Sequence, residues 1–160
     1  MGTHSRIGIE MPDHTVVSVY CHWDGYPEYT GKMLVGKMLV KYYHDREDVE
    51  DLVDGGSMSS LRTRSTWGTG SMLRDEDGEI ICDSEGFHMY ENDREPQPLY
   101  YIERGEDEPP SHTSFDAFVR GMCGEEYAYL YDLNGNWKAY KIGDRAGIVD
   151  RVEIPGYVTA

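Results

Sequence analysis

The chain has 160 residues, of which 39% are hydrophobic and 28% are charged, as expected for one globular domain with a substantial core. Thirty acidic against fifteen basic residues give a net charge of −15. This balance argues against direct binding of nucleic acid, because phosphate contacts require lysine and arginine. No apolar run reaches the ~18 residues of a membrane span, so we expect no membrane contact.

The cysteines and the first residues bear on compartment and cofactors. Cys21, Cys82 and Cys123 are widely spaced and form no Cys-x-x-Cys pair, so they do not predict a structural zinc site. Reduced thiols are simplest in the cytosol, and the first residues lack the pattern of a signal peptide. We therefore expect a cytoplasmic protein with no metal and no cofactor.

The first elements are two predicted strands. Residues 6–10 and 15–21 alternate apolar and polar side chains, as half-buried strands do. The short polar turn at residues 12–14 joins them, which predicts an antiparallel hairpin. The face expected to point into the core carries Val17, Val19 and Cys21.

A helix is predicted next, over residues 30–43. It contains the pentapeptide Gly-Lys-Met-Leu-Val twice in succession, at residues 31–35 and 36–40. Five residues turn an α-helix by about 500°, so the two copies face about 140° apart. A continuous helix would be apolar over much of its circumference, so we expect an extra turn or a break near Gly36. Deletion of residues 36–40 should leave a folded protein.

The middle of the chain predicts one helix, a loop and a second hairpin. The helix runs from an Asp45 cap to the glycine pair at residues 55–56. Residues 57–70 are rich in serine, threonine and glycine and predict a long loop. Residues 72–82 predict a hairpin around the Asp-Glu-Asp-Gly turn at residues 75–78, whose spacing does not fit an EF-hand calcium loop.

The remaining elements are a loop, a short helix and a third hairpin. The prolines in residues 96–98 predict the loop, and Ser114 is the expected helix cap. Residues 127–133 and 137–142 flank Asn134-Gly135, the strongest short hairpin signal in the chain.

The element order predicts an α+β fold. We expect an antiparallel β-sheet built from hairpins, with two to three helices packed on one face. Residues 1–142 are predicted to form a single domain. Residues 143–160 are expected to add a C-terminal edge strand or a tail that orders on a partner.

Acidic residues concentrate between Asp75 and Glu108. Thirteen acids against two bases in this stretch leave −11 of the total charge of −15. One interpretation is a solvated face that aids solubility. The alternative is a surface that docks on a basic partner, such as a nucleic-acid-binding protein, with the turn residues Asp75, Glu76 and Asp77 as candidate contacts.

Tyrosines provide a second candidate surface. Tyr127, Tyr129 and Tyr131 share one face of a predicted strand. Tyrosine is favoured at protein interfaces because it combines a large contact area with a polar tip. The alternative is ordinary packing of the sheet beneath a helix.

Residues 21–27 form the most chemically varied stretch of the chain. They place a thiol, an imidazole, an indole, a carboxylate and a phenol at a strand-to-helix corner. The Arg-Gly-Glu sequence of residues 104–106 could converge on this corner and complete a pocket for a small ligand or a divalent metal. A structural corner, with Arg104 paired to Asp24 or Glu106, is the alternative. No nucleophile lies at an identifiable elbow, so no catalytic residue is assigned. The pocket candidate comprises His22, Trp23, Asp24, Tyr26, Arg104 and Glu106.

Several segments together carry a family resemblance: residues 6–10, residues 18–26, Gly31-Lys32 with Arg46-Glu47, and residues 125–130. In these the chain resembles a widespread family of small tailed-bacteriophage proteins, over roughly residues 3–142. Members carry a strand ending in Cys-His-aromatic-Asp-Gly-Tyr and a later Arg-Asp-Arg-Gly-Glu, of which this chain matches the last three positions. The resemblance implies a phage gene product in the cytoplasm of an infected bacterium, and no known activity.

These observations favour a non-enzymatic function. We expect an acidic accessory protein that binds and inhibits or redirects a host protein with a basic surface, in host takeover or anti-defence. One alternative is a small-ligand or nucleotide-binding protein, or a hydrolase, using a pocket of His22, Asp24, Arg104 and Glu106. Another is a minor component of the virion.

Overall fold

The computed structural model describes residues 3–27, 35–63, 73–82, 96–142, 149–154 and 157. Residues 62–97 form a compact unit of their own, and the segments on either side of them together form a larger unit. The candidate site lies in the larger unit, and each unit is considered by itself.

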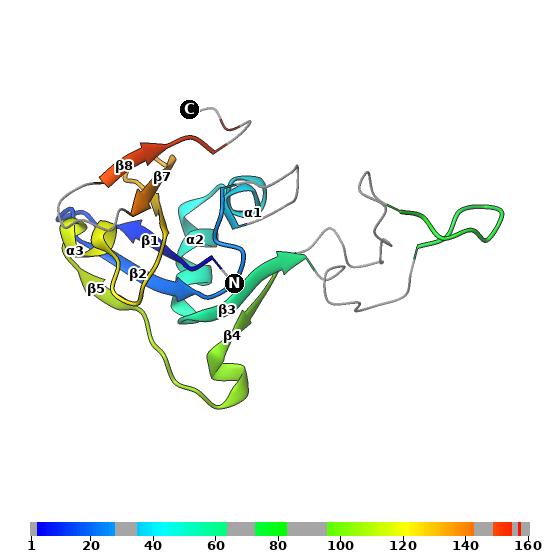
Figure 1. Cartoon of the computed structure of the whole chain (residues 1–160), viewed down its shortest axis with the longest axis horizontal. Coiled ribbons are helices and arrows are strands. Elements are labelled where there is room, and N and C mark those ends of the chain that lie inside the picture. The colour runs from blue at the N-terminus through cyan, green and yellow to red at the C-terminus, as the bar shows by residue number, and fades with distance from the viewer. Residues whose placement is uncertain are drawn as a thin grey trace. The chain divides into compact units, whose positions relative to one another are not determined.

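Eight strands of the described chain belong to one sheet (Figure 1). The strands are β1 (Ser5–Glu10), β2 (Val16–Cys21), β3 (Met58–Thr63), β4 (Pro96–Tyr100), β5 (Ser111–Thr113), β6 (Tyr127–Tyr131), β7 (Trp137–Ile142) and β8 (Val149–Val152). The α-helices are α1 (Val35–Tyr42), α2 (Arg46–Asp54) and α3 (Phe115–Arg120), and a 3-10 helix, η2, spans Tyr101–Arg104. The strand order is β4-β3-β2-β1-β6-β7-β8, and β5 lies beside β2.

The α+β prediction is confirmed, but the sheet is mixed rather than purely antiparallel. The predicted hairpins are present, β1 with β2 and β6 with β7, and β8 extends the sheet antiparallel to β7. The central strand β1 also pairs in parallel with β6, with Ile7 opposite Tyr129. A parallel pair needs a long crossover connection, which leaves no local turn signal in the sequence.

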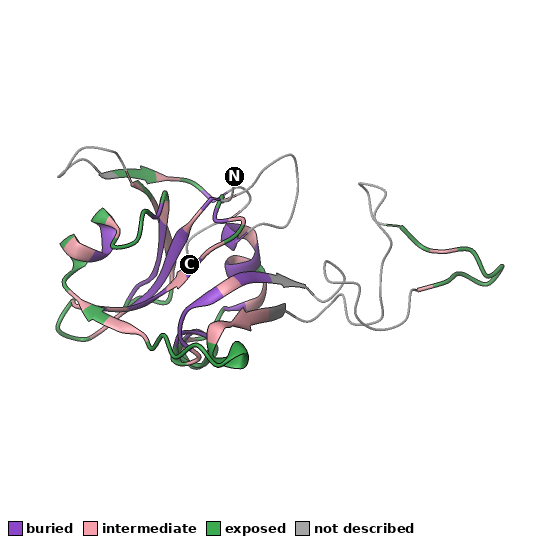
Figure 2. Ribbon diagram, turned by 60° about the horizontal axis from the view of Figure 1, so that its bottom comes forward, coloured by how far each residue is buried: buried purple, intermediate pink, exposed green. Residues whose placement is uncertain are grey.

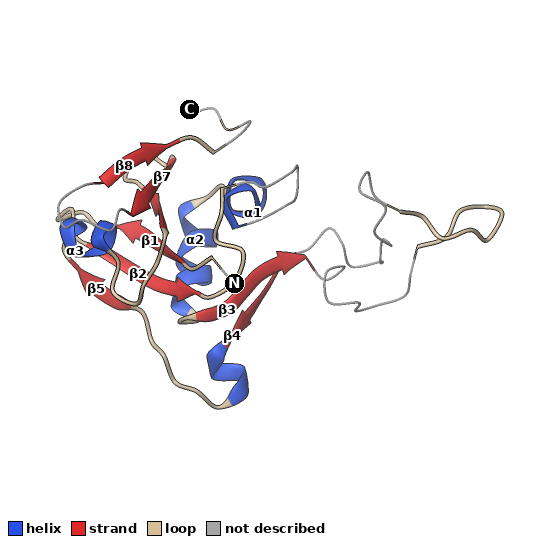
Figure 3. Ribbon diagram, in the orientation of Figure 1, coloured by secondary structure: helices blue, strands red, loops and turns tan. Residues whose placement is uncertain are grey.

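Helices cover both faces of the sheet (Figures 2 and 3). Two of them, α1 and α2, pack on the face that carries Ile7, Ile9 and Val19, in agreement with the predicted alternation of β1 and β2. The third helix, α3, lies on the opposite face, where Phe118 packs with Val16. Both faces of the central strands are therefore buried, which explains why β6 is apolar at nearly every position.

The duplicated pentapeptide begins the described part of α1. The helix starts at Val35, and residues 28–34 lie outside the described residues. Met38 and Leu39 of the second copy are completely buried against the sheet. A Cβ atom at Gly36 would lie 2.5 Å from Cα of Pro27, so the chain on either side of residues 28–34 is in close contact.

Deletion of residues 36–40 gives the same sequence as deletion of residues 31–35. The shortened chain therefore keeps the buried Met38 and Leu39 of the helix. Thr30 then directly precedes Gly36 and takes the buried position of Val35. We expect a folded protein that is less stable by about 1–3 kcal/mol, because a hydroxyl enters an apolar site. Thermal unfolding checks this, and loss of a cooperative transition would show that the pentapeptide repeat is indispensable.

Two predicted loops are strands in the structure. Met58–Thr63, within the predicted loop of residues 57–70, forms β3 and joins β2 through the parallel pair Cys21–Met58. Pro96 begins β4, the terminal strand of the sheet, where a proline is tolerated because no neighbour needs its missing N–H group. The loop predictions at these two positions were wrong because partners supplied by distant segments override local propensity.

The helix caps follow the sequence in part. Ser114 caps α3 as predicted, since its hydroxyl accepts a hydrogen bond from the backbone N–H of Ala117 at 3.2 Å. Asp45 occupies the N-cap position of α2, but its side chain makes no capping hydrogen bond. The helix ends at Asp54, Gly55 is its C-cap residue, and Gly56 has a positive φ of 88°.

Candidate functional site

The corner that follows β2 is fixed by main-chain hydrogen bonds to two other segments. The N–H groups of His22 and Trp23 donate to the carbonyls of Met58 and Ser59, at 3.1 and 2.9 Å. The N–H of Gly25 donates to the carbonyl of Thr3 at 2.8 Å. These bonds hold the side chains of the corner on a rigid backbone.

Asp24 shapes the turn at this corner. Its φ of 58° is in the left-handed region that few residues other than glycine adopt. Its carbonyl accepts a hydrogen bond from Val35 at the start of α1, at 3.0 Å. Asp24 therefore directs the chain from the strand to the helix, as the structural interpretation of this motif expects.

Four side chains at this corner form an aromatic cluster: His4, Tyr20, His22 and Trp23. The imidazoles of His4 and His22 stack with ring centroids 4.4 Å apart, and Trp23 meets His22 edge to face at 4.6 Å. Nδ1 of His4 donates to the carbonyl of His22 at 2.7 Å, and the Tyr20 hydroxyl is 2.8 Å from Nδ1 of His22. The rings of His4, Tyr20 and His22 contact one another, and Trp23, which adjoins His22, is 42% exposed.

One imidazole of this cluster, that of His22, is uncharged at neutral pH. Burial and, to a smaller extent, the neighbouring His4 lower the pKa of His22. Burial and the neighbouring Tyr101 raise the pKa of Tyr20 to about 12. At neutral pH, His22 is thus an uncharged ring beside a protonated phenol.

The sequence prediction found His22 and Trp23 but missed His4 and Tyr20. The register of the first hairpin pairs Ser5 with Cys21, which brings the residues just outside this pair, His4 and His22, to the same end of the hairpin. If the register of the hairpin predicted over residues 6–21 had been assigned correctly, it would have placed His4 beside His22. Tyr20 lies on the face of its strand opposite Val19 and Cys21, and it is half-buried.

The structure does not bring Arg104 and Glu106 to His22. Arg104 instead pairs with Glu106 at 2.9 Å, and both side chains are more than half exposed. Its guanidinium also lies over the Tyr101 ring, 4.7 Å from the centroid. In the described part of the chain, no hydrogen bond, ion pair or ring contact joins His22 to either residue. The contacts that the structure gives Arg104 and Glu106 are thus with each other and with Tyr101, and none of them reaches His22.

Tyr26, another member of the predicted pocket, contacts strand β6. Its ring packs against Tyr127 with centroids 5.7 Å apart, and its side chain is 37% exposed. It thus belongs to the packing between the corner and β6.

The tyrosine face of β6 belongs largely to the core. Tyr129 is completely buried and Tyr131 nearly so, and their hydroxyls donate to the carbonyls of Gly25 and His44 at 2.6 and 2.7 Å. Burial raises the pKa of Tyr129 well above its usual value. These two rings are inaccessible to a partner, because they pack beneath α1 and α2 as the alternative of ordinary sheet packing expects.

A buried ion pair lies on the α3 face of the sheet. Nε of Arg6 is 3.7 Å from Oε2 of Glu125, and Nη1 of Arg6 donates to the Ser18 hydroxyl at 2.9 Å. The carboxylate of Glu125 also accepts hydrogen bonds from the N–H groups of Met122 and Cys123, both at 2.6 Å. Glu125 thus fixes the turn that connects α3 to β6.

One group of exposed acids in the larger unit lies along α2 and along residues 103–108, which begin in η2. We use the term acidic face for nine exposed residues: Glu47, Asp48, Glu50, Asp51, Asp54, Glu103, Glu106, Asp107 and Glu108. Five of them belong to the nine residues of α2, whose opposite side packs on the sheet. The sequence prediction assigned α2 only its apolar stripe, although this density of acids was visible in the sequence.

Tyr100 connects the two parts of the acidic face. Its hydroxyl donates to the carbonyl of Leu52 in α2 at 2.8 Å. Burial raises the pKa of Tyr100 to about 12, and the nearby carboxylates of Glu103, Asp51 and Asp54 add to this shift. The carboxylates of α2 and of η2 are therefore close enough to act on one hydroxyl.

The segment that carries the second part of the acidic face is fixed at both ends. The N–H of Tyr101 donates to the carbonyl of Ser57 at 3.1 Å, and the N–H of Ser57 donates to the carbonyl of Glu108 at 2.9 Å. Gly105 adopts a positive φ of 82°, and Glu106 bonds back to the carbonyl of Tyr101. The acids between these anchors are thus presented on an ordered backbone.

The predicted acidic turn at residues 75–78 lies in the smaller unit and is a tight hairpin turn. The Asp75 carboxylate accepts hydrogen bonds from the N–H groups of Asp77 and Glu79, at 2.9 and 3.0 Å. Arg74 donates to the carbonyl of Gly78 at 2.8 Å. Asp75 therefore has a structural role in the turn, whereas Glu76 and Asp77 are exposed.

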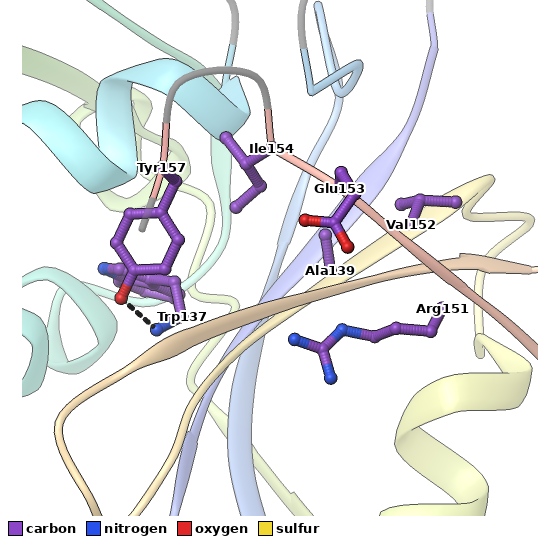
Figure 4. A pocket seen from close by; sticks show the side chains of 7 residues that line it. All are labelled: Trp137, Ala139, Arg151, Val152, Glu153, Ile154 and Tyr157. Carbon is purple, nitrogen blue, oxygen red and sulfur yellow. Dashed lines mark hydrogen bonds between the residues drawn. The ribbon is translucent and has the colours of Figure 1, made fainter. Parts of the chain in front are cut away.

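A cavity of about 320 Å³ opens where β8 separates from β7 (Figure 4). The N–H of Trp137 donates to the Tyr157 hydroxyl at 2.9 Å, beyond the last pair of the ladder, Ala139 with Val152. The sequence analysis did not predict this cavity. It is lined by Trp137, Ala139, Arg151, Val152, Glu153, Ile154 and Tyr157.

Comparison of the chain with family models, curated proteins and solved structures finds no match. Among the described residues, no helix is long and apolar enough to cross a bilayer. The same residues hold no group of three or more histidine, cysteine or acidic side chains placed to bind a metal ion.

Proposed function

We propose that this protein is a non-enzymatic, acidic accessory protein of a bacteriophage that binds and inhibits or redirects a bacterial host protein. The acidic face is the observation that carries the proposal, and the phage origin rests on the resemblance of the sequence. A rigid set of carboxylates on a helix and an adjoining segment complements a partner with a basic surface, such as a nucleic-acid-binding protein.

The geometry favours recognition by contact over chemistry on a small substrate. The carboxylates lie on a helix and on an anchored segment, and the two arginines beside them are already paired, Arg104 with Glu106 and Arg46 with Glu50. Charges of one sign on such a surface steer association and select partners. The alternative of a ligand pocket or hydrolase at His22 loses support, because Arg104 and Glu106 do not complete that pocket.

Two charge variants test whether the acidic face or net charge alone carries binding. The first neutralises three acids of α2, in Glu47→Gln, Asp51→Asn and Asp54→Asn. The second is a control that removes the same charge from the turn of the smaller unit, in Asp75→Asn, Glu76→Gln and Asp77→Asn. Both sets are exposed, so both variants should fold, and thermal unfolding verifies this.

The measurement is capture of a partner from bacterial lysate, followed by kinetics with the purified partner. We expect the α2 variant to bind at least about tenfold more weakly, because it associates more slowly. The on-rate of the parent should fall as salt rises from low to physiological concentration, because salt screens the same charges. The turn variant should bind nearly as well as the parent. Equal weakening by both variants, or binding indifferent to salt, would contradict a role for the acidic face.

A further inference from the structure

We infer that the aromatic cluster of His4, Tyr20, His22 and Trp23 is the contact point for an arginine side chain of the basic partner. The inference rests on the proposed function and names the chemistry of one contact within it. Three observations support it: the exposure and rigidity of Trp23, the hydrogen-bonding state of His4, and the nearness of the acidic face.

Trp23 has the properties of an anchor at a protein interface. Its indole is 42% exposed, although its backbone is fixed to β3 by the hydrogen bond to Ser59. His22 supports the ring edge to face. An exposed indole on an ordered backbone loses little conformational entropy on binding, and tryptophan is the ring that attracts a cation most strongly.

His4 adds a hydrogen-bond acceptor beside this ring. Its Nδ1 lies 2.7 Å from the carbonyl of His22, and a carbonyl only accepts, so Nδ1 carries the proton in the neutral imidazole. Nε2 of His4 then holds a lone pair. A guanidinium has a flat face that stacks on aromatic rings and N–H groups at its edge that donate, which suits this combination better than the ammonium of lysine.

The acidic face lies next to the cluster through Ser57. The N–H of Tyr20 donates to the Ser57 hydroxyl and the N–H of Tyr101 donates to the Ser57 carbonyl, both at 3.1 Å. The N–H of Ser57 donates to the carbonyl of Glu108 at 2.9 Å, so Ser57 connects the cluster to the segment that carries these acids. The protein itself shows the proposed chemistry there: Arg104 lies over the Tyr101 ring while it pairs with Glu106. A second arginine, from a partner, would find an aromatic surface and carboxylates in the same neighbourhood.

The experiment compares two probes of equal charge, a hexa-arginine and a hexa-lysine peptide, at one physiological ionic strength. Isothermal titration gives the two affinities, and the indole N–H resonances in NMR spectra report contact at tryptophan. We expect the wild type to prefer arginine by about two- to fivefold, the range of an exposed cation–π contact. Trp23→Ala should abolish this preference, and Trp23→Phe should keep part of it.

Leu133→Ala is the matched control, because Leu133 is 43% exposed in the turn between β6 and β7. This variant should retain the full preference for arginine. A preference that survives Trp23→Ala would overturn the inference while leaving the proposed function intact. Failure of both peptides to bind the wild type would count against the acidic face as well, and only that result would remove both proposals together.

Discussion

Replacement of Glu125 by alanine is expected to destabilise the protein by about 3–5 kcal/mol, the cost of removing one partner of a buried ion pair. The side chains of Arg6 and Glu125 are 4% and 0% exposed, so the guanidinium would be left charged without its carboxylate. The N–H groups of Met122 and Cys123 would also lose their acceptor. Urea unfolding monitored by circular dichroism measures the effect.

A double replacement separates the loss of the pair from the loss of packing. In Arg6→Met with Glu125→Ala no buried charge remains, so the double variant should be more stable than Glu125→Ala alone. Glu125→Gln, which keeps an acceptor for the turn, should fall between the parent and the alanine variant. A double variant at least as unstable as the single one would show that the cost does not arise from the stranded arginine.

Replacement of Phe118 by alanine is expected to cost about 3–5 kcal/mol as well, because it opens a cavity under α3. Phe118 is completely buried and packs this short helix on the sheet. Phe115→Ala is the control on the same helix, since Phe115 is 37% exposed, and we expect it to cost less than about 1 kcal/mol. Chemical unfolding of both variants gives the comparison.

Gly8 offers a second check on the same contact. A Cβ atom at this position would lie 2.7 Å from the Phe118 ring and 2.6 Å from Val16, so Gly8→Ala alone should destabilise by about 1–3 kcal/mol. With Phe118→Ala the added methyl group has room on the side of the missing ring. The double variant should therefore lose less stability than the two single variants combined, and strict additivity would contradict the contact.

The parts of the fold that depend on neighbouring residues were predictable. The alternation in residues 6–10 and 15–21 predicted the first hairpin and its inward face, and Asn134-Gly135 predicted the turn between β6 and β7. Ser114 was correctly identified as a helix cap. Each of these signals acts over a few residues, where turn geometry and capping have strong residue preferences.

The parts that depend on distant residues were not predictable in the same way. The polar composition of Met58–Thr63 predicts a loop, but the segment forms a strand because β2 lies beside it. At the candidate site, the motif at residues 21–27 was correctly recognised as a corner, but its partner is His4, not the Arg-Gly-Glu segment. Sequence spacing does not show which distant side chains meet, because the strand order decides it.

The parallel pairing of β1 with β6 has a consequence for how the chain reaches its native state. The central strand finds one neighbour, β2, almost at once through a hairpin, but its other neighbour comes only after every described helix has been synthesised. Closing so long a loop is entropically unfavourable, and folding rates fall as contacts become more distant in sequence. Until β6 arrives, the open edge of β1 exposes unpaired backbone groups, so the incomplete sheet is prone to pair with other chains at this stage.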